Sequence, residues 1–512
     1  MPYSKTRRKN WINIHQTFKQ KVAAYYNFSN HRDINDPLER YNNTTEELMQ
    51  FVSLVNDEGM TLRVVGGGWS WPKIAATDGI MINSKPLNLT FRIGANLVSS
   101  EYKNSHEDLY FAQCGVSINE LNKQLSEIGR SLSTSGASNG QTIAGALSTG
   151  THGGAIDFGS MPEFVVGLHI ITGPNQHYYL ERKSYSVVSD HFISRLGTTL
   201  LRDDDLFNSA LVSFGAFGII HGVMIETEEI FDYEAKRKTI NLNEELRVLL
   251  STLDFDRAPT PIPKERPYHF GIVYNPYIHT NNAHVTYMYK RKFREKENSI
   301  RAKYEIGISE DAVTMIGKLF DFSSVITKVI INKMIKSKYK DYETYGTQGE
   351  IFSNTSTGGK VLSLAIAIPM KEVLKVINLY IELIEKSGTV PCILALRYVA
   401  KSSALLGFTK YDPSCVVEID GTYSKKVYKL YEAFAAALDE MKIEHTYHWG
   451  KVIYTNKTKL IAAYGEDAVN KWIVSRNQLI KEPAMLELFS NQLLKDWGLD
   501  TILPSVPENP VV

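Results

Sequence analysis

Long apolar runs, a strong excess of charge and a large number of cysteines are all absent from this sequence of 512 residues. No stretch of about 18 apolar residues occurs, so we expect no membrane-spanning helix. The N-terminus is basic, but no apolar segment follows it, which argues against a secretory signal. The formal net charge of +1 gives no overall field that would attract nucleic acid, and we expect no nucleic-acid partner.

Cysteine is scarce, and its three positions match no metal-binding pattern. Cys114, Cys392 and Cys415 lie far apart in the sequence and do not have the spacing of zinc ligands, so no metal site is expected. A small, odd number of cysteines is typical of a reducing compartment, and we therefore expect a cytoplasmic protein. The composition is that of a globular protein, and the length suffices for two or three domains with a sizeable core.

The first 230 or so residues carry the pattern of one α+β unit. Apolar residues at helical spacing predict helices over 45–56 and 118–128. Short apolar runs predict strands over 61–65, 164–172 and 218–227.

A different pattern follows after Glu234. Strands are predicted over 361–368, 391–399 and 414–419, and helices over 370–384 and 425–441. This alternation is typical of an antiparallel sheet backed by helices.

A basic stretch lies between Lys290 and Lys340, where lysine and arginine clearly outnumber the acidic residues. It also contains apolar residues at several positions. We favour a solvated basic helix that packs one apolar face on the protein. The alternative is a lid, or a helix that contacts a membrane surface.

Two glycine-rich segments are the most informative part of the sequence. One is Val65-Gly66-Gly67-Gly68-Trp69-Ser70, and the other runs from Leu132 to Gly154 with dense glycine, serine and threonine and almost no charge. Such segments bring backbone N–H donors close to a ligand. Neither a GxGxxG nor a Walker pattern is present, and Pro72 would break the helix that both require. The first loop alone is compatible with a structural turn, but the pair predicts a large, anionic, partly planar ligand.

The segments VVGGGWS, SGASNGQTIAGALSTGTHG and LFNSALVSFGAFGIIHGVMIE occur in an order that resembles FAD-linked oxidases of the vanillyl-alcohol oxidase, or PCMH-type, superfamily. The similarity is greatest to the branch of alditol, aldonolactone and sterol oxidases. It implies an α+β fold with a two-subdomain PCMH-type FAD-binding domain over 1–232. A substrate-binding cap domain, with an antiparallel sheet backed by helices, would follow over 233–445. The C-terminal segment 446–512 would return to the flavin site.

The resemblance implies FAD as cofactor and assigns two loops and one strand to it. His152 is expected to be a structural imidazole that bonds the loop backbone rather than a catalytic group. The residues expected to bind FAD are Val65, Gly66, Gly67, Gly68, Trp69, Ser70, Ser135, Gly136, Thr142, Gly145, Ser148, Thr149, Gly150, Thr151, His152, Gly153, Ile219 and Ile220.

The flavin is expected to be held without a covalent bond. Many relatives have a histidine at the position of Trp69, and that histidine bonds covalently to the flavin. Tryptophan has no nucleophilic ring nitrogen for this linkage. Other relatives use a cysteine in the later loop, but none occurs between residues 132 and 154, and Cys114 is expected to be buried structure.

His448-Trp449-Gly450-Lys451 resembles the HWxK motif that alditol and aldonolactone oxidases place beside the flavin. Alcohol oxidation moves a hydride to the flavin and a proton to a base. His448 can take or relay such a proton near neutral pH. The Lys451 ammonium can stabilise a developing alkoxide or the reduced flavin.

Arg397 lies on the predicted strand where alditol oxidases carry Glu-x-Arg, but Ala395 replaces the glutamate here. By strand parity Glu418 on the next strand points to the same side, so we expect Arg397 and Glu418 to face each other over the flavin. A purely structural ion pair is the alternative. The lost glutamate argues against a simple polyol, and nearby Leu405, Leu406 and Phe408 suggest a bulkier or less polar substrate.

These features predict an FAD-dependent oxidoreductase that oxidises a CH–OH group of a small or medium-sized substrate by hydride transfer to the flavin, with oxygen as the expected acceptor. One alternative is a dehydrogenase that passes electrons to a cytochrome or quinone. Another is a flavin-binding protein without turnover. The substrate and the oligomeric state cannot be read from the sequence.

Overall fold

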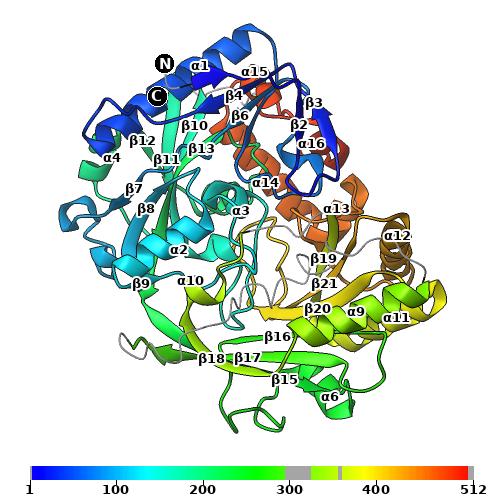
Figure 1. The fold of residues 1–512 in the computed structure, drawn as a ribbon. Helices are drawn as coiled ribbons and strands as arrows, with labels where there is room; N and C mark the ends of the chain where they lie inside the picture. The colour runs from blue at the N-terminus through cyan, green and yellow to red at the C-terminus, as the bar shows by residue number, and fades with distance from the viewer. Residues whose placement is uncertain (1–2, 295–323, 356–359, 505–512) are drawn as a thin grey trace.

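The computed structural model describes residues 3–294, 324–355 and 360–504. Three sheets of four, six and eight strands dominate the chain (Figure 1). The strands of the four-stranded sheet lie in the order β1 (Tyr3–Lys5), β4 (Ala24–Phe28), β6 (Ile80–Asn83) and β5 (Leu62–Val65). The last three pair in parallel, and the edge strand β1 pairs antiparallel with β4. A two-stranded hairpin, β2 (Asn10–Ile12) and β3 (Lys19–Lys21), lies between its first two strands in the sequence.

Helix α1 (Pro37–Asp57) packs its apolar face in the same core as this sheet. It begins eight residues before the predicted start at Thr45. Asp36 caps it by accepting a hydrogen bond from the Glu39 N–H, and Pro37 occupies the first turn. The start signal was therefore present in the sequence, but the apolar spacing alone placed it too late.

The six-stranded sheet is antiparallel except for its β11–β12 pair. Its strands in order are β12 (Thr199–Arg202), β11 (Gln176–Glu181), β10 (Val165–Gly173), β13 (Ile219–Glu226), β8 (Leu109–Gln113) and β7 (Thr90–Arg92). Associated with it are α2 (Ile118–Glu127), α3 (Ile143–Ser148), α4 (Asp190–Leu196), α5 (Asp204–Leu211) and the short pair β9 (Arg130–Ser131) and β14 (Glu228–Glu229).

The eight-stranded sheet is antiparallel, as the sequence predicted for the second half of the chain. Its strands in order are β18 (Tyr342–Thr347), β15 (Phe231–Ile240), β17 (Ala283–Lys292), β16 (His269–Tyr274), β20 (Cys392–Val399), β21 (Ser414–Thr422), β19 (Val361–Pro369) and β22 (Thr446–Tyr447).

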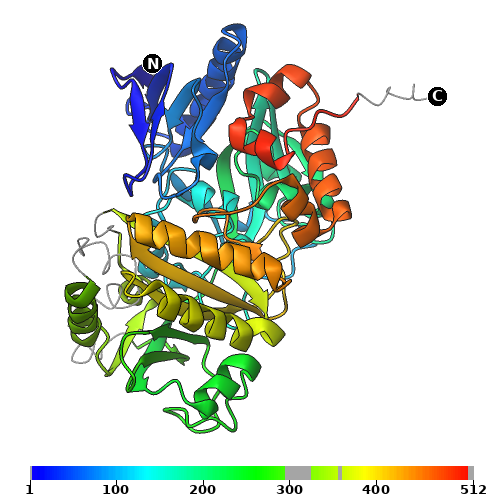
Figure 2. The same cartoon turned by 90° about the vertical axis from the view of Figure 1, so that its right-hand side faces the viewer.

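Helices back one face of this sheet, and Figure 2 shows two of them, α11 and α12, side by side across it. The opposite face turns inward. Ala365, Ala367 and Val416 of that face share a buried cluster with Leu147 and Trp449, so the sheet packs directly on the part of the chain that carries the glycine-rich loops. The helices near the sheet are α6 (Glu244–Thr252), α9 (Ser324–Lys338), α10 (Gln348–Ile351), α11 (Val373–Ser387) and α12 (Lys425–Glu440).

The C-terminal helices return to the first half of the chain. Trp472 and Trp497 lie in one buried cluster with Phe214 and Phe217, and Leu486 lies in the core of the four-stranded sheet. The division at residues 232 and 445 stays a prediction, although β15 opens and β22 closes the eight-stranded sheet close to these positions. The C-terminal helices are α13 (Lys457–Tyr464), α14 (Glu466–Leu479), α15 (Pro483–Leu488) and α16 (Gln492–Trp497).

Part of the basic stretch of residues 290–340 forms α9. Ile331 and Ile335 are buried against the eight-stranded sheet, while Lys333 and Lys336 are exposed, as the favoured interpretation of a solvated basic helix requires. Residues 295–323 of this stretch lie outside the described residues. Within the described ranges, no helix combines the length and the apolar character needed to cross a bilayer.

Candidate functional site

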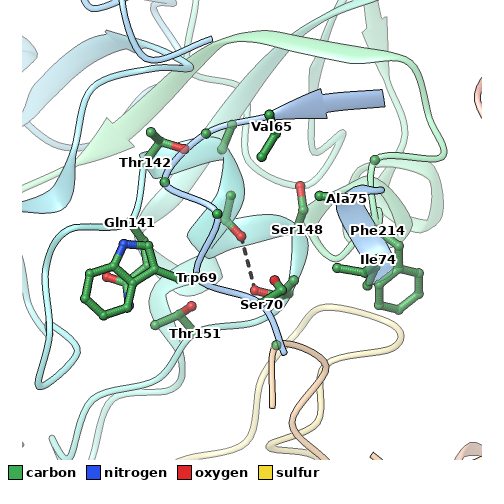
Figure 3. A pocket seen from close by; sticks show the side chains of 18 of the residues that line it. Val65, Trp69, Ser70, Ile74, Ala75, Gln141, Thr142, Ser148, Thr151 and Phe214 are labelled. Carbon is green, nitrogen blue, oxygen red and sulfur yellow. Dashed lines mark hydrogen bonds between the residues drawn. The ribbon is translucent and has the colours of Figure 1, made fainter. Parts of the chain in front are cut away.

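One cavity brings together the two glycine-rich loops and the inward face of the eight-stranded sheet. Figure 3 shows Trp69 and Ser70 of the first loop around the same space as Thr142, Ser148 and Thr151 of the second. The expected cofactor residues that line it are Val65, Gly66, Gly67, Gly68, Trp69, Ser70, Gly136, Thr142, Gly145, Ser148, Thr149, Thr151, His152, Ile219 and Ile220, and all four expected catalytic residues, Arg397, Glu418, His448 and Lys451, line it as well.

Three expected cofactor residues are not among those that line the cavity. Ser135 is buried and donates its hydroxyl to Asn139 Oδ1 at 2.9 Å. Gly150 has a φ of +66°, and Gly153 packs so closely on Thr134 that a Cβ there would lie 2.0 Å from the threonine hydroxyl. The contacts of these residues lie within the second loop and its surroundings, and a direct contact with the cofactor stays a prediction for them.

The two loops touch at a point where only glycine fits. A Cβ on Gly66 would lie 2.0 Å from Thr142 Oγ1, well inside any tolerable contact. Gly68, at the other end of the triplet, has a φ of +69°, which L side chains rarely adopt. Glycine is therefore required at Gly66 by the close approach of Thr142 and at Gly68 by the positive φ.

The first loop offers unused backbone donors to the cavity. In the described part of the chain, none of the N–H groups from Gly66 to Ser70 has a hydrogen-bond partner. Consecutive free N–H groups that line a concave surface form a typical anion site. This donor set, with no side chain at Gly66, Gly67 or Gly68, fits the pyrophosphate of FAD.

No strong nucleophile suited to a flavin linkage appears at the positions that relatives use. Trp69 carries an indole that packs next to Gly67 and Gly140. Cys114 lines the cavity, but burial raises the pKa of its thiol to about 12, so it remains a neutral thiol.

Arg397 and Glu418 form a buried ion pair, which confirms the expectation that they face each other. Arg397 Nη1 lies 3.0 Å from Glu418 Oε2, and their side chains are 11% and 8% exposed. His152 Nε2 contacts the other oxygen, Glu418 Oε1, at 3.1 Å, while its Nδ1 lies 2.9 Å from the Gly153 carbonyl oxygen. The loop backbone therefore holds His152 as expected, but its contact with Glu418 was not foreseen.

Burial by itself would raise the pKa of Glu418. The positive charge of Arg397, followed by Lys451 and the contact with His152, outweighs this effect and holds the pKa well below its usual range. Glu418 is therefore a carboxylate at neutral pH and has lone pairs left for a ligand.

His448 differs from the sequence-based expectation of a proton acceptor. The Gly450 N–H donates to His448 Nδ1 at 2.9 Å, so in the neutral ring Nε2 carries the hydrogen. Burial lowers the pKa of His448 well below its usual value, and the nearby His152 and Lys451 lower it further. In this state His448 is a neutral donor at Nε2, which differs from the expected base, and relay of a proton through its ring stays a prediction.

Lys451 lies over an aromatic ring of the first loop region. Its Nζ is 4.8 Å from the centre of the Trp71 ring, and the Trp71 indole N–H donates to the Val361 carbonyl at 2.8 Å. The Trp71 backbone N–H also donates to the Gly450 carbonyl, at 3.0 Å. The HWGK segment is thereby joined to the loop that contains the glycine triplet.

Sequence reasoning missed three charged or titratable residues that line the cavity. Asp420 lies two residues after Glu418 on the same strand, and strand parity was the signal for it. Arg63 is buried, and no sequence motif predicts its role. It donates to the carbonyls of Ile74, Phe214, Gly215 and Phe489. His15 comes from the N-terminal hairpin region, far from either loop in sequence.

The apolar residues suggested for substrate contact lie behind the cavity wall, where the Phe408 ring packs on the cavity-lining His152 and His448. Leu406 and Phe408 are fully buried in a core cluster, and Leu405 packs against the same cluster. None of the three is among the cavity-lining residues. The suggestion of a bulkier or less polar substrate therefore gains no support from these three side chains and stays a prediction.

The cavity combines glycine loops that offer free backbone donors with an antiparallel sheet that contributes charged side chains. These features define the class of FAD-binding oxidoreductases that the loop motifs resemble. Comparisons with known proteins agree. Residues 41–177 match the model of an FAD binding domain, and residues 267–490 match that of D-arabinono-1,4-lactone oxidase.

Individual relatives are distant. A D-arabinono-1,4-lactone oxidase of Eremothecium gossypii is 26% identical over 38% of this chain and 32% of its own length. The chain thus spans about a third of this relative. An L-gulono-1,4-lactone dehydrogenase of Mycobacterium tuberculosis is 21% identical over 88% of this chain and 94% of its own length.

Among solved structures, a cholesterol oxidase from B. sterolicum has a TM-score of 0.69 with 12% identity and covers 97% of both chains, which shows a shared fold. The chain thus combines an FAD binding domain with a region of the D-arabinono-1,4-lactone oxidase type, and it shares its fold with cholesterol oxidase.

Proposed function

We propose that this protein is an FAD-dependent oxidoreductase that oxidises a CH–OH group of a small molecule. The observation that carries the proposal is the position of Glu418. Its carboxylate, fixed by Arg397 at 3.0 Å and by His152 at 3.1 Å, lines the same cavity as the free N–H groups of the first glycine loop. A cofactor-binding surface and an ionised hydrogen-bond acceptor thus share one enclosed space.

The two loops would hold FAD without a covalent bond. The N–H groups from Gly66 to Ser70 would bind the pyrophosphate, and Thr142, Ser148 and Thr151 would contribute hydroxyls. When bound, FAD supplies an acceptor for the hydride that leaves the substrate carbon.

Glu418 would orient the substrate. A carboxylate with both oxygens anchored presents its remaining lone pairs in a fixed direction, and it would accept the hydrogen bond of the substrate hydroxyl. The His448 Nε2–H would donate to an oxygen of the same substrate. An acceptor and a donor that line one cavity would select a carbon that carries a hydroxyl beside another oxygen function.

Arg397 and Lys451 would lower the cost of negative charge on the substrate oxygen. The hydroxyl proton would pass to the Glu418 carboxylate that accepts its hydrogen bond. Cations already held in the site would stabilise the negative charge that develops on the substrate oxygen during this transfer, without reorganisation. Lys451 is held by its contact with Trp71, and Arg397 by its pair with Glu418.

Aldono-1,4-lactones are the substrate class that we favour. The relatives named above act on D-arabinono-1,4-lactone and L-gulono-1,4-lactone. Such lactones present a hydroxyl next to a carbonyl oxygen, which suits the paired acceptor and donor of Glu418 and His448. Asp420, on the same cavity wall, would accept a further hydroxyl.

The test is anaerobic mixing of the FAD-loaded protein with L-gulono-1,4-lactone, D-arabinono-1,4-lactone and, for comparison, a 3β-hydroxysterol. We expect a lactone to abolish the visible absorbance of the oxidised flavin and the sterol to leave it unchanged. Bleaching by none of several aldonolactones would contradict the substrate class. It would favour the alternative of a flavin-binding protein without turnover.

The electron acceptor is a separate question, since one relative is named an oxidase and the other a dehydrogenase. We favour oxygen. Stopped-flow mixing of the dithionite-reduced protein with aerated buffer decides this. Reoxidation within seconds would support an oxidase, and a half-life of minutes or more would favour transfer to a cytochrome or quinone.

A cytoplasmic location, which agrees with three free cysteines, is to be tested by cell fractionation.

A further inference from the structure

His15 reaches the cavity from the N-terminal segment between β2 and β3. The Ile14 N–H donates to the Gly68 carbonyl at 2.9 Å, and the Asn13 side-chain amide donates to the Ser70 carbonyl at 3.1 Å. These two bonds hold the segment against the first glycine loop. The His15 side chain is fully buried, with 0% of the residue exposed, and lines the cavity.

The orientation of the His15 ring is set by two contacts. Nε2 lies 3.0 Å from the Trp69 carbonyl oxygen, and the ring stacks on Trp71 with 3.8 Å between centres and 12° between planes. A carbonyl oxygen can only accept, so Nε2 must carry the hydrogen and donate it. The ring is thereby fixed both in its plane and in its tautomer.

That tautomer leaves Nδ1 as a lone pair. Nδ1 is buried and has no hydrogen-bond partner within the described ranges of the chain. Burial lowers the pKa of His15 to about 3, and the charge of Lys451 adds to the effect, so the ring stays neutral at physiological pH. A buried acceptor without a donor is costly, which makes an unpaired one in a ligand cavity a sign of an absent partner.

We propose that His15 Nδ1 accepts a hydrogen bond from an N–H or O–H group of bound FAD. The inference rests on the proposed binding of FAD to the two loops. His15 is bonded to the backbone of the loop that would hold the cofactor, and FAD carries several hydroxyl and N–H donors. The N-terminal segment then contributes directly to the cofactor site.

Two substitutions separate this role from a structural one. His15→Gln places an amide N–H where Nε2 was, so it retains the bond to the Trp69 carbonyl but removes the acceptor at Nδ1. His15→Asn places its side-chain oxygen near Nδ1, so it keeps the acceptor but gives up the bond to Trp69. The dissociation constant of FAD is measured by titrating FAD into the full-length apoprotein of each, and the melting temperature is recorded without FAD.

We expect His15→Gln to weaken FAD binding by about 3- to 10-fold with little change in the melting temperature of the apoprotein, the effect of one lost hydrogen bond. His15→Asn should bind FAD more tightly than His15→Gln although its apoprotein melts lower. Equal FAD affinity of His15→Gln and wild type would overturn the inference. So would a weakening in His15→Asn alone, which would show that only the bond to Trp69 matters.

A measurement on the unmodified chain covers the case in which both variants misfold. With ¹⁵N-labelled histidine, the Nδ1 resonance of His15 should move upfield when FAD binds, as a lone pair does on accepting a hydrogen bond. An unchanged resonance would overturn the inference. A wild-type chain that binds no FAD would instead overturn the proposed function, and the inference with it.

Discussion

Arg397 Nη1 lies 3.0 Å from Glu418 Oε2 across two neighbouring strands, β20 and β21. The residue directly opposite Glu418 in the register is Ala395, so the arginine reaches the carboxylate diagonally. The Glu-x-Arg pattern implied by the resemblance to alditol oxidases is absent, and the carboxylate that pairs with Arg397 comes from the adjacent strand. The pair of charges is retained although the local motif is broken.

Replacement of Arg397 by methionine should make stability less sensitive to acid, although it lowers stability at neutral pH. The pKa of Glu418 in the folded protein is below its usual value of 4.5. Its contribution is therefore fully present above the unfolded pKa and is lost as pH falls through the folded pKa. Arg397→Met raises the folded pKa towards or above the unfolded value, so the loss of stability on acidification should shrink or reverse. The free energy of unfolding at pH 7 should fall by about 3 kcal/mol, because Glu418 loses its buried partner.

Urea unfolding from pH 7 to pH 4 measures both effects. Arg257→Met is a matched control, because Arg257 pairs with Asp254 while its side chain is 90% exposed, and a change within about 0.5 kcal/mol is expected. If Arg397→Met and wild type lose stability in parallel as the pH falls, Arg397 does not control the titration of Glu418.

Replacement of Lys451 by methionine should slow reduction of the flavin by substrate. The cation that lies over Trp71 would no longer stabilise negative charge on the substrate oxygen, and removal of one such group costs on the order of 100-fold in rate. The rate is read from anaerobic stopped-flow absorbance at saturating aldonolactone. Lys425→Met changes an exposed lysine on α12 and should leave the rate unaltered. An unchanged rate in Lys451→Met would remove this lysine from the mechanism.

FAD should leave the protein when the protein is denatured in acid. Trp69 offers no nucleophilic nitrogen, and burial raises the pKa of the Cys114 thiol to about 12, so neither would form a covalent bond to the flavin. The measurement is the visible spectrum of the supernatant after precipitation and centrifugation, with free FAD carried through the same steps as a control. Yellow colour retained in the pellet would show a covalent link, and peptide mass spectrometry would then locate it.

Replacement of Gly66 by alanine should weaken FAD binding. The added Cβ would lie 2.0 Å from Thr142 Oγ1, so the two loops must move apart, and overpacking of this kind corresponds to about 10-fold or more in affinity. Gly173→Ala is the matched control, since its Cβ would meet neighbours only at 3.6–3.8 Å. Fluorescence titration with FAD gives both affinities. Equal binding by Gly66→Ala and Gly173→Ala would show that loop contact is not needed for the cofactor.

Many residues of the candidate cofactor site could be predicted from the sequence, because the backbone conformation and side-chain direction that the site needs depend on neighbouring residues. Close approach between two backbones requires glycine, and the consecutive glycines Gly66 to Gly68 indicate such an approach in the sequence. Strand parity likewise placed Arg397 and Glu418 on the inward side of β20 and β21, since side chains alternate with a period of two. The strands that carry them were predicted to within a few residues.

The remaining features depend on contacts between segments that are distant in the sequence. His15 approaches Trp69 and Trp71 only after the N-terminal hairpin packs on the first loop. The tautomer of His448 follows from one backbone N–H, and the low pKa of Glu418 follows from Arg397, Lys451 and His152 together. The sequence by itself determined which loops line the cavity and which strand positions face inward, because backbone conformation and side-chain alternation are local. Only the tertiary structure decided which groups hold a proton and which acceptor lacks a partner, because burial and the distance between charges exist only in the folded chain.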